Sequence, residues 1–227
     1  MKQRVFGTVA AFLAAVLLLT VPCSANSARS AVVLDCVSGR LLLDKKGSEK
    51  SLIASTTKIM TALLVCERCN VLDQMVIPKQ AVGIEGSSMY LKEGERLTLQ
   101  ELLYGLMLSS GNDAAVALAL YCCGSIQEFA NLMNDKARSL GMTGSHFENP
   151  NGLDSPNHYS TARDLAILAS YAMENPIFQK TVSTKTVTVG NRVLRNHNKL
   201  LWLYPEADGV KTGYTKAAGR ILVSSAV

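Results

Sequence analysis

Residues 54–64 read Ala-Ser-Thr-Thr-Lys-Ile-Met-Thr-Ala-Leu-Leu, and this stretch decides how the rest of the chain is interpreted. Its apolar residues recur three and four positions apart, which predicts one buried face of a helix running from Ser55 to about Glu67. Residues three positions apart lie on the same face of a helix, so Lys58 can reach the hydroxyl of Ser55. The stretch therefore predicts a buried helix that opens on a serine and a lysine in contact.

Two further short motifs follow in order, Ser110-Gly-Asn112 between two apolar helical runs and Lys211-Thr-Gly213 in a β-rich run. Either triplet alone is a common turn or strand composition. An S-x-x-K, an S-D-N and a K-T-G together form the motif set of penicillin-binding proteins and class A β-lactamases. Gly111 stands here where that pattern has Asp. The ordered set indicates a serine acyl-transferase of the penicillin-recognising type.

The chemistry of such a site needs a base beside the serine, because a serine hydroxyl is a weak nucleophile at neutral pH. Lys58 must be neutral for part of the cycle, and desolvation together with the charge of Lys211 would lower its pKa. Ser110 and Lys211 could relay a proton to the leaving amine. We therefore predict Ser55, Lys58 and Ser110 as catalytic residues.

The remaining motif residues are predicted to bind the substrate. Lys211 and Thr212 would project from an edge strand and hold a terminal carboxylate, while the strand pairs with an extended peptide. Asn112 would position the substrate's amide. The backbone N–H groups of Ser55 and Tyr214 are the candidate oxyanion hole. The predicted substrate-binding residues are Asn112, Lys211, Thr212, Gly213 and Tyr214.

Strand patterns lie toward both ends of the chain, and helix patterns lie between them. Hairpins are expected at residues 31–43, 184–195 and 209–223, and helices at about residues 55–67, 98–108, 113–122, 126–140 and 161–173. Thr98 should open its helix with a capping box, and Asp113 should cap the next one. The order predicts an α+β fold in which a helical lobe packs against an antiparallel β-sheet.

The N-terminus has the three regions of a secretory signal peptide: Lys2 and Arg4, the uncharged run Val5–Val21, and small residues up to Ala25. We expect residues 1–25 to be a signal peptide cleaved near Ala25, and residues 26–227 to be an exported catalytic domain. The alternative is an uncleaved helix that anchors the chain at the membrane surface.

Charge and cysteine content exclude other classes of function. The chain has a formal net charge of +5 and no run of Lys or Arg longer than two residues, which does not indicate a nucleic-acid surface. Without Cys23, five cysteines remain, and an odd number leaves at least one thiol outside any internal pair. Cys66 and Cys69 have C-x-x-C spacing, but we interpret them and Cys122-Cys123 as small buried hydrophobic residues.

No cofactor or metal ion is expected. The chain has three histidines, none three to five positions from another, so the C-x-x-C pair has no matching ligands. The histidines are predicted to be hydrogen-bonding residues of loops, although His197 and Trp202 could line the cleft. These histidines are His146, His158 and His197.

Four stretches together resemble the serine-type D-alanyl-D-alanine carboxypeptidases, the low-molecular-mass penicillin-binding proteins with a β-lactamase-like fold. They are residues 54–62, Asn149-Pro-Asn-Gly-Leu-Asp154, residues 158–165 and residues 208–215. The resemblance implies removal of the terminal D-alanine from peptidoglycan stem pentapeptides through an acyl-enzyme on Ser55. It also implies inhibition by β-lactams, a role in cell-wall synthesis or remodelling, and action in the cell wall or at the outer face of the cytoplasmic membrane.

Members of that family usually continue well beyond the strand that follows the third motif. We therefore expect a catalytic domain truncated at its C-terminus, with an incomplete sheet and with Arg220 as a substitute for a later arginine. Two other functions stay open. A class A-like β-lactamase would need a deacylating glutamate, for which Glu148 is the nearest candidate. A non-catalytic wall-binding or sensor module would bind ligands without turnover.

Overall fold

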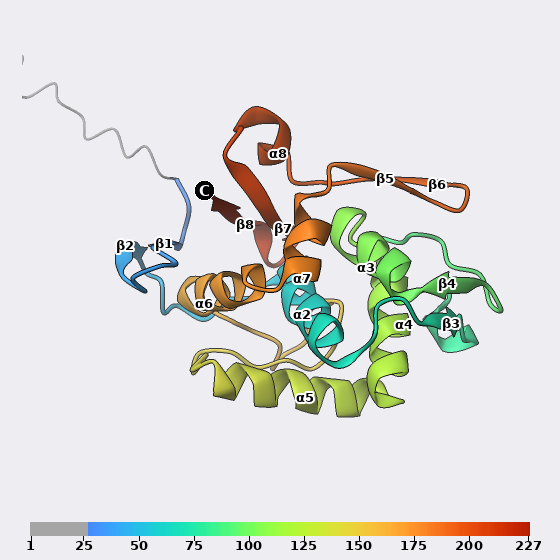
Figure 1. The fold of residues 1–227 in the computed structure, drawn as a ribbon. Helices are drawn as coiled ribbons and strands as arrows, with labels where there is room; N and C mark the ends of the chain where they lie inside the picture. Colours follow the sequence, from blue (N-terminus) through green and yellow to red (C-terminus); the bar gives the residue numbers. More distant parts are fainter. Residues whose placement is uncertain (1–26) are drawn as a thin grey trace, which may run out of the picture.

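In the computed structural model of residues 27–227, helices occupy most of the middle of the chain, with two three-residue strands among them, and the longer strands lie toward both ends (Figure 1). The predicted α+β class is confirmed. The predicted signal peptide, residues 1–25, lies outside the described residues, as does Cys23.

The bounds of the elements follow the chain order. The helices are η1 (Ala54–Thr57), α2 (Lys58–Arg68), η2 (Lys79–Ala81), α3 (Leu99–Leu108), α4 (Asn112–Cys123), α5 (Ile126–Ser139), α6 (Ala162–Met173), α7 (Pro176–Ser183) and α8 (Leu200–Leu203). The strands are β1 (Ala31–Leu34), β2 (Leu41–Lys45), β3 (Gln74–Val76), β4 (Arg96–Thr98), β5 (Thr186–Val189), β6 (Arg192–Arg195), β7 (Ala207–Thr215) and β8 (Gly219–Ala226).

Helix α2 runs through the centre of the molecule and packs against α3, α4, α5, α6 and α7 (Figure 1). Every residue from Lys58 to Val65 is buried, so this part of the helix is enclosed on all sides and not only on the predicted apolar face, whereas Glu67 and Arg68 are exposed. A helix segment that is buried all round lies inside a core. Its first residue, Lys58, is therefore held in the interior of the molecule.

The strands of the described chain form four antiparallel pairs, β1–β2, β3–β4, β5–β6 and β7–β8, each a separate two-stranded sheet. The hairpins predicted at residues 31–43, 184–195 and 209–223 are confirmed, and the last one is longer than predicted. Helix α6 contacts both β1 and β8, so the N-terminal and C-terminal hairpins lie against the same helix. This arrangement brings β7, the strand of the third motif, beside η1.

Local signals identified most helices correctly. The capping box at Thr98 is confirmed: its side chain accepts a hydrogen bond from the backbone of Glu101, and the Glu101 carboxylate accepts one from the Thr98 backbone. Strands β3 and β4 were not predicted, because three residues are too few to show a period. Helix α7 was also missed, although Asn175-Pro176 is a typical helix start: the Asn175 side chain caps the helix and Pro176 is its first residue.

The predicted cap of α4 at Asp113 is wrong. The N-cap residue is Gly111, and Asp113 lies within the first turn, where it is 1 % exposed. Its carboxylate accepts hydrogen bonds from the hydroxyl of Ser88 and from the backbone N–H groups of Met89 and Leu91. The side chain of Asp113 therefore forms long-range hydrogen bonds, which the local sequence pattern does not contain, and does not cap the helix.

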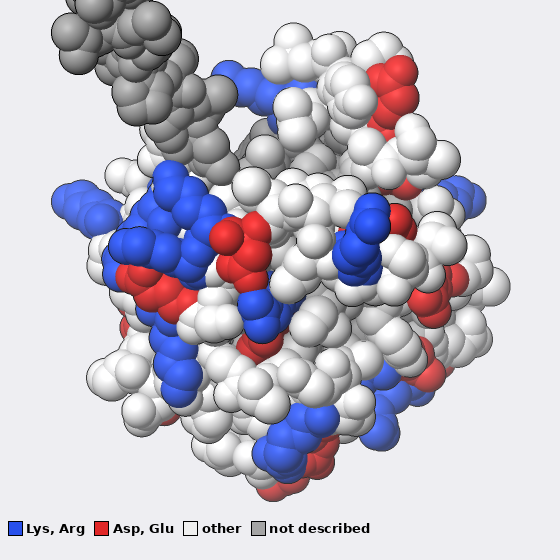
Figure 2. Space-filling model, turned by 90° about the vertical axis from the view of Figure 1, so that its left-hand side faces the viewer, with Lys and Arg blue, Asp and Glu red and all other residues white. Residues whose placement is uncertain are grey.

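Basic and acidic side chains are interspersed on the face that carries β1, β2 and α6 (Figure 2). On the hairpin side of the molecule Arg29 pairs with Glu49, and Arg163 pairs with Asp44. Among residues 27–227 no single helix is long and apolar enough to cross a membrane. Helices α4 and α5 reach that length and composition only as a pair, bent by 85°.

The capping box should contribute measurably to stability. We expect Thr98→Ala to lower the free energy of unfolding by about 1 kcal/mol, because the backbone N–H of Glu101 loses its acceptor. Urea unfolding followed by circular dichroism measures the change. Thr98→Ser keeps the hydroxyl and should stay close to the unsubstituted protein, and an equal loss in both variants would contradict the capping role.

Candidate active site

The three motifs meet at one cleft of about 780 Å³ between the helices and β7. Its lining includes residues of each motif, namely Ser55, Ser110, Thr212, Gly213 and Tyr214, together with Ser87 and residues 197–200 and 220–222. Lys58 and Lys211 are 0 % and 1 % exposed, so both amines lie beneath the cleft surface. The sequence prediction that these residues gather in one place agrees with the structure.

Ser55 is placed by the tight turn η1, and not by the α-helix that was expected to begin there. The α-helix starts at Lys58, and Ala54 adopts a left-handed backbone with φ +45°. Gly152 packs so closely on this turn that an added Cβ would lie 1.9 Å from the carbonyl oxygen of Ala54. The turn that carries Ser55 is thus held in a strained conformation by a neighbouring loop.

Lys58 has three oxygen neighbours. Its Nζ lies 3.0 Å from Oγ of Ser55, 2.6 Å from Oδ1 of Asn112 and 2.5 Å from the carbonyl oxygen of Asn151. A neutral amine has two N–H groups and one lone pair. Because Asn112 and Asn151 offer only acceptors to it, they can take the two N–H groups, and the lone pair then faces Ser55. This geometry suits a base that accepts the proton of the serine hydroxyl.

The surroundings of Lys58 also favour its neutral form. Burial lowers the pKa of Lys58 well below its usual range, and the nearby charge of Lys211 lowers it further. The carboxylate of Asp113 acts in the opposite direction. Removing a charged amine from water costs more free energy than these contacts restore, so the ammonium of Lys58 loses its proton more easily.

Lys211 forms a second buried pair with Ser110. Its Nζ donates hydrogen bonds to Oγ of Ser110 at 3.1 Å and to the carbonyl oxygen of Thr212 at 2.9 Å. Burial lowers the pKa of Lys211 to about 7. Ser110 has a left-handed backbone with φ +59°, which is uncommon for a residue other than glycine. This pair shares the cleft with Ser55. Because the pKa of Lys211 is near neutrality, the pair can accept and release a proton there.

Strand β7 approaches the Ser55 turn at Gly213. A Cβ added to this glycine would lie 3.2 Å from the backbone nitrogens of Ser55 and Thr56 and from the carbonyl oxygen of Ile53. A larger residue here would require a shift of a few tenths of an ångström between the strand and the Ser55 turn. Tyr214 follows, with its side chain 64 % exposed. The close approach sets the width of the cleft beside Ser55.

The carboxamide of Asn112 contacts two protein groups: Oδ1 accepts from Lys58, and Nδ2 donates to the carbonyl oxygen of Glu85 at 2.5 Å. Both ends of the side chain are therefore occupied by protein groups, and the residue is 5 % exposed. In this structure Asn112 orients Lys58. The predicted role of Asn112 in positioning the substrate's amide stays a prediction.

The role of Asn151 was not predicted. Its carbonyl oxygen contacts Lys58, and the neighbouring carbonyl of Pro150 accepts a hydrogen bond from Thr61 Oγ1 at 2.6 Å. In the sequence, the stretch Asn149–Asp154 contributed only to the family resemblance, and no role was predicted for its backbone. Every residue has a backbone carbonyl, so the residue type at position 151 does not indicate this contact and no local signal could identify it.

The side chains of His146 and His158 form hydrogen bonds, as predicted, although His158 is buried. His158 is 1 % exposed: its Nδ1 accepts from the backbone of Glu148, and its Nε2 bonds Oγ1 of Thr57 at 2.7 Å. Burial lowers the pKa of His158 to about 4, which keeps the ring neutral. His197 lines the cleft, whereas Trp202 does not; Trp202 carries the guanidinium of Arg195 over its ring.

Glu148, the candidate deacylating residue of a β-lactamase, does not line the cleft. Its carboxylate accepts hydrogen bonds from Ser155 and from Asn157 in its own loop. The lining residues, all of which belong to the described part of the chain, include no Asp or Glu. Arg220, the proposed substitute arginine, does line the cleft.

The cysteines lie away from the cleft. Cys66, Cys69, Cys122 and Cys123 are half-buried against the core, and none of the five cysteines of residues 27–227 forms a disulfide. Burial raises the pKa of Cys66 to about 12 and those of Cys122 and Cys123 to about 11. The described residues contain no cluster of ligands that could hold a metal ion.

Comparisons with known proteins agree with this geometry. A family model described as D-alanyl-D-alanine carboxypeptidase matches residues 19–227. The D-alanyl-D-alanine carboxypeptidase DacF of Bacillus subtilis is 39% identical over 212 residues, which are 89% of this chain and 54% of that protein. DacC of Escherichia coli is 36% identical over 220 residues, which are 91% of this chain and 55% of that protein. The chain thus spans about half the length of these curated relatives.

Solved structures share the fold. A variant of the Streptomyces K15 DD-transpeptidase superposes with a TM-score of 0.85 at 34% identity, over 88% of this chain and 86% of that one. The D-alanyl-D-alanine carboxypeptidase DacD of Francisella tularensis does so with a TM-score of 0.81 at 30% identity, over 89% of this chain and 63% of that one. By sequence and by fold, this chain belongs to the D-alanyl-D-alanine carboxypeptidase (peptidase S11) family.

Proposed function

We propose that this chain is a serine D-alanyl-D-alanine carboxypeptidase that removes the terminal D-alanine from peptidoglycan stem pentapeptides in cell-wall synthesis or remodelling. One observation carries the proposal: Nζ of the buried Lys58 lies 3.0 Å from Oγ of Ser55, while Asn112 and Asn151 occupy its other sides. The proposal includes export, with residues 1–25 as a signal peptide and residues 26–227 as the catalytic domain, and action outside the cytoplasmic membrane.

Acylation begins with the neutral amine of Lys58, which accepts the hydroxyl proton as Oγ of Ser55 attacks the carbonyl of the penultimate D-alanine. The peptide C–N bond breaks, and Lys58 passes the proton that it took from Ser55 to the leaving amine through Ser110 and Lys211, whose polar atoms lie 3.1 Å apart. Lys58 is then neutral again. Water then attacks the ester carbonyl, again with Lys58 as base. The enzyme returns to its starting state with one D-alanine released.

Substrate binding uses the edge of β7. An extended peptide pairs with the strand, its terminal carboxylate lies near Lys211 and Thr212, and its reacting carbonyl oxygen accepts from the backbone N–H groups of Ser55 and Tyr214. Gly213 supports this placement because it brings the strand within van der Waals contact of the Ser55 turn. Each oxyanion donor of this kind typically contributes about 3–4 kcal/mol to the transition state.

Covalent labelling tests the proposed nucleophile, because β-lactams should acylate Ser55 as the substrate does. Incubation with penicillin should add the mass of one penicillin, mapped to the peptide that contains Ser55. Ser55→Ala should lose the label and lower D-alanine release from a D-Ala-D-Ala peptide by at least about 1,000-fold, since the nucleophile is gone. Ser183→Ala, outside the cleft, should keep both activities.

A chromogenic β-lactam, tested beside the labelling experiment, separates the other two functions. Rapid, steady hydrolysis of a chromogenic β-lactam would indicate a β-lactamase, whereas the absence of a carboxylate from the cleft lining favours a slowly hydrolysed adduct. Ligand binding with neither label nor D-alanine release would indicate a non-catalytic wall-binding module and contradict the proposal.

A further prediction concerns the pH dependence of the acylation rate constant. This rate constant should rise with pH while Lys58 loses its proton, because only the neutral amine accepts a proton. The loss of charge at Lys211 near pH 7 should oppose this rise, because that charge holds the carboxylate. Stopped-flow or quenched acylation across pH 5–9 measures both effects.

Lys211→Arg serves as the test variant for the opposing effect. Arginine stays protonated throughout this range, so the opposing effect near pH 7 should disappear in folded protein. An opposing effect that stays near pH 7 in this variant would contradict the assignment to Lys211.

A further inference from the structure

Residues 83–94, called here the cleft segment, lie between η2 and β4 in the chain. The cleft segment contains no helix or strand and places Ser87 in the cleft lining. The side chain of Tyr90 is 80 % exposed, and its backbone has a left-handed φ of +59°. A segment without regular structure needs specific contacts to keep one conformation, because few of its backbone groups are paired by a helix or a sheet.

The cleft segment determines how Asn112 is oriented. The carbonyl oxygen of Glu85 accepts from Nδ2 of Asn112 at 2.5 Å, and the carbonyl oxygen of Ser87 accepts from the Asn112 backbone at 2.7 Å. Gly86, with φ +91°, lies so close that an added Cβ would be 2.7 Å from Nδ2. With its amino end held by a carbonyl, the carboxamide must present its oxygen to Lys58.

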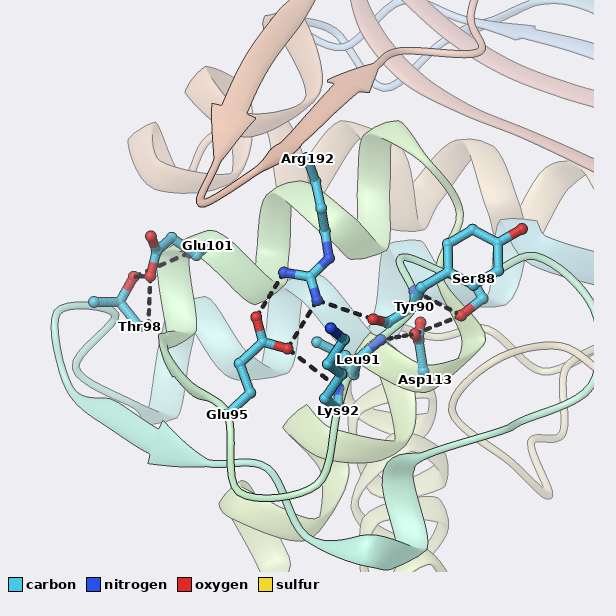
Figure 3. Close-up of polar contacts among 9 residues, drawn as sticks. All are labelled: Ser88, Tyr90, Leu91, Lys92, Glu95, Thr98, Glu101, Asp113 and Arg192. Atoms are coloured by element: carbon cyan, nitrogen blue, oxygen red, sulfur yellow. Dashed lines mark hydrogen bonds and ion pairs between the residues drawn. The ribbon is translucent and has the colours of Figure 1, made fainter.

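Two polar contacts hold the cleft segment in turn. The first is the buried Asp113, which accepts from the hydroxyl of Ser88 at 2.6 Å and from the backbone of Met89 and Leu91 at 3.1 and 3.0 Å. Figure 3 shows this carboxylate beside the segment. Asp113 is the residue after Asn112, so this contact ties the segment directly to the second motif.

The second contact comes from the β5–β6 hairpin. Arg192, the first residue of β6, reaches from the hairpin to the segment and donates to both carboxylate oxygens of Glu95, at 2.6 and 2.8 Å (Figure 3). It also donates to the carbonyl oxygen of Tyr90 at 2.9 Å. One guanidinium therefore joins the left-handed residue of the segment to the residue just after its end.

We propose that Arg192 is a positioning residue for acylation: from the hairpin it fixes the cleft segment, and the segment fixes the Asn112 carboxamide that orients Lys58. The inference rests on the proposed function, because Lys58 is taken as the base for Ser55. Arg192 itself is not among the residues that line the cleft. It acts through three successive hydrogen bonds: Arg192 to Tyr90, Asn112 to Glu85 and Lys58 to Asn112.

The Arg192–Glu95 pair is suited to this task. The side chains are 16% and 22% exposed, and the contact is bidentate, which fixes direction as well as distance. A single exposed ion pair contributes little, whereas a partly buried bidentate pair is less screened by water. The guanidinium also holds the pKa of Glu95 below its usual value, so the pair persists through the neutral range.

The test compares two ion pairs of similar burial in the full chain. Arg192→Gln removes the contact to the cleft segment. Lys136→Gln is the matched control, because the Lys136–Glu67 pair is 14% and 26% exposed, measures 2.6 Å and does not involve the cleft. Arg192→Lys keeps the charge without the bidentate geometry.

Three quantities are measured for each variant: the second-order rate constant of penicillin acylation at 25 °C, the melting temperature, and hydrogen exchange of residues 83–94. Arg192→Gln should slow acylation about tenfold, within the roughly 100-fold that a 1 Å misplacement can cost, and should speed exchange in the segment. Arg192→Lys should recover part of both. Lys136→Gln should lower the melting temperature similarly and leave acylation and segment exchange unchanged.

Several outcomes would overturn the proposal. Arg192→Gln could acylate at the unsubstituted rate, or it could slow acylation without any change of exchange in the segment. Equal slowing in Lys136→Gln would assign the effect to general destabilisation. If the unsubstituted protein formed no adduct at all, the proposed function would fail instead, and hydrogen exchange would still decide whether Arg192 holds the segment.

Discussion

The buried amine of Lys58 is the constraint on which the rest of the site depends. Its three oxygen neighbours come from three separate parts of the chain: η1, the start of α4 and the loop at residues 149–154. Placing an amine in the interior is costly unless its hydrogen-bonding groups are used and its charge is given up. The contacts satisfy the first condition, and burial with the neighbouring Lys211 lowers the pKa to meet the second.

Backbone strain lies at the same place. Ala54, just before Ser55, and Ser110, the partner of Lys211, both have left-handed φ values, of +45° and +59°. Such conformations cost about 1–3 kcal/mol and persist only where the surroundings determine them. Here Gly152 and Gly213 let the neighbouring chain approach within contact of the Ser55 turn. The geometry of Ser55 is thus imposed by packing from outside its own motif.

The sequence was sufficient for the parts of the site that local patterns encode. Ser55-x-x-Lys58 could be read because helical spacing brings the two residues together, and the Thr98 capping box because its partners lie three positions apart. Contacts between distant segments left no such pattern. Asn151 acts through its backbone, Asp113 looks locally like a cap, and Arg192 lies 97 residues from its partner Glu95. The separate two-stranded sheets likewise depend on tertiary packing, and hydrophobic alternation alone does not specify them.

The most direct test of the account is the titration of Lys58 itself. The ¹³Cε resonance of this lysine, assigned by its loss in Lys58→Arg, should be followed by NMR from pH 5 to 11 in the protein without ligand. We predict that the amine of Lys58 loses its proton well below the 10.5 of a free lysine, and that Lys211 loses its proton at about pH 7. A Lys58 resonance that reports a charged amine up to pH 10 would contradict it, because a permanent ammonium cannot take the proton of Ser55.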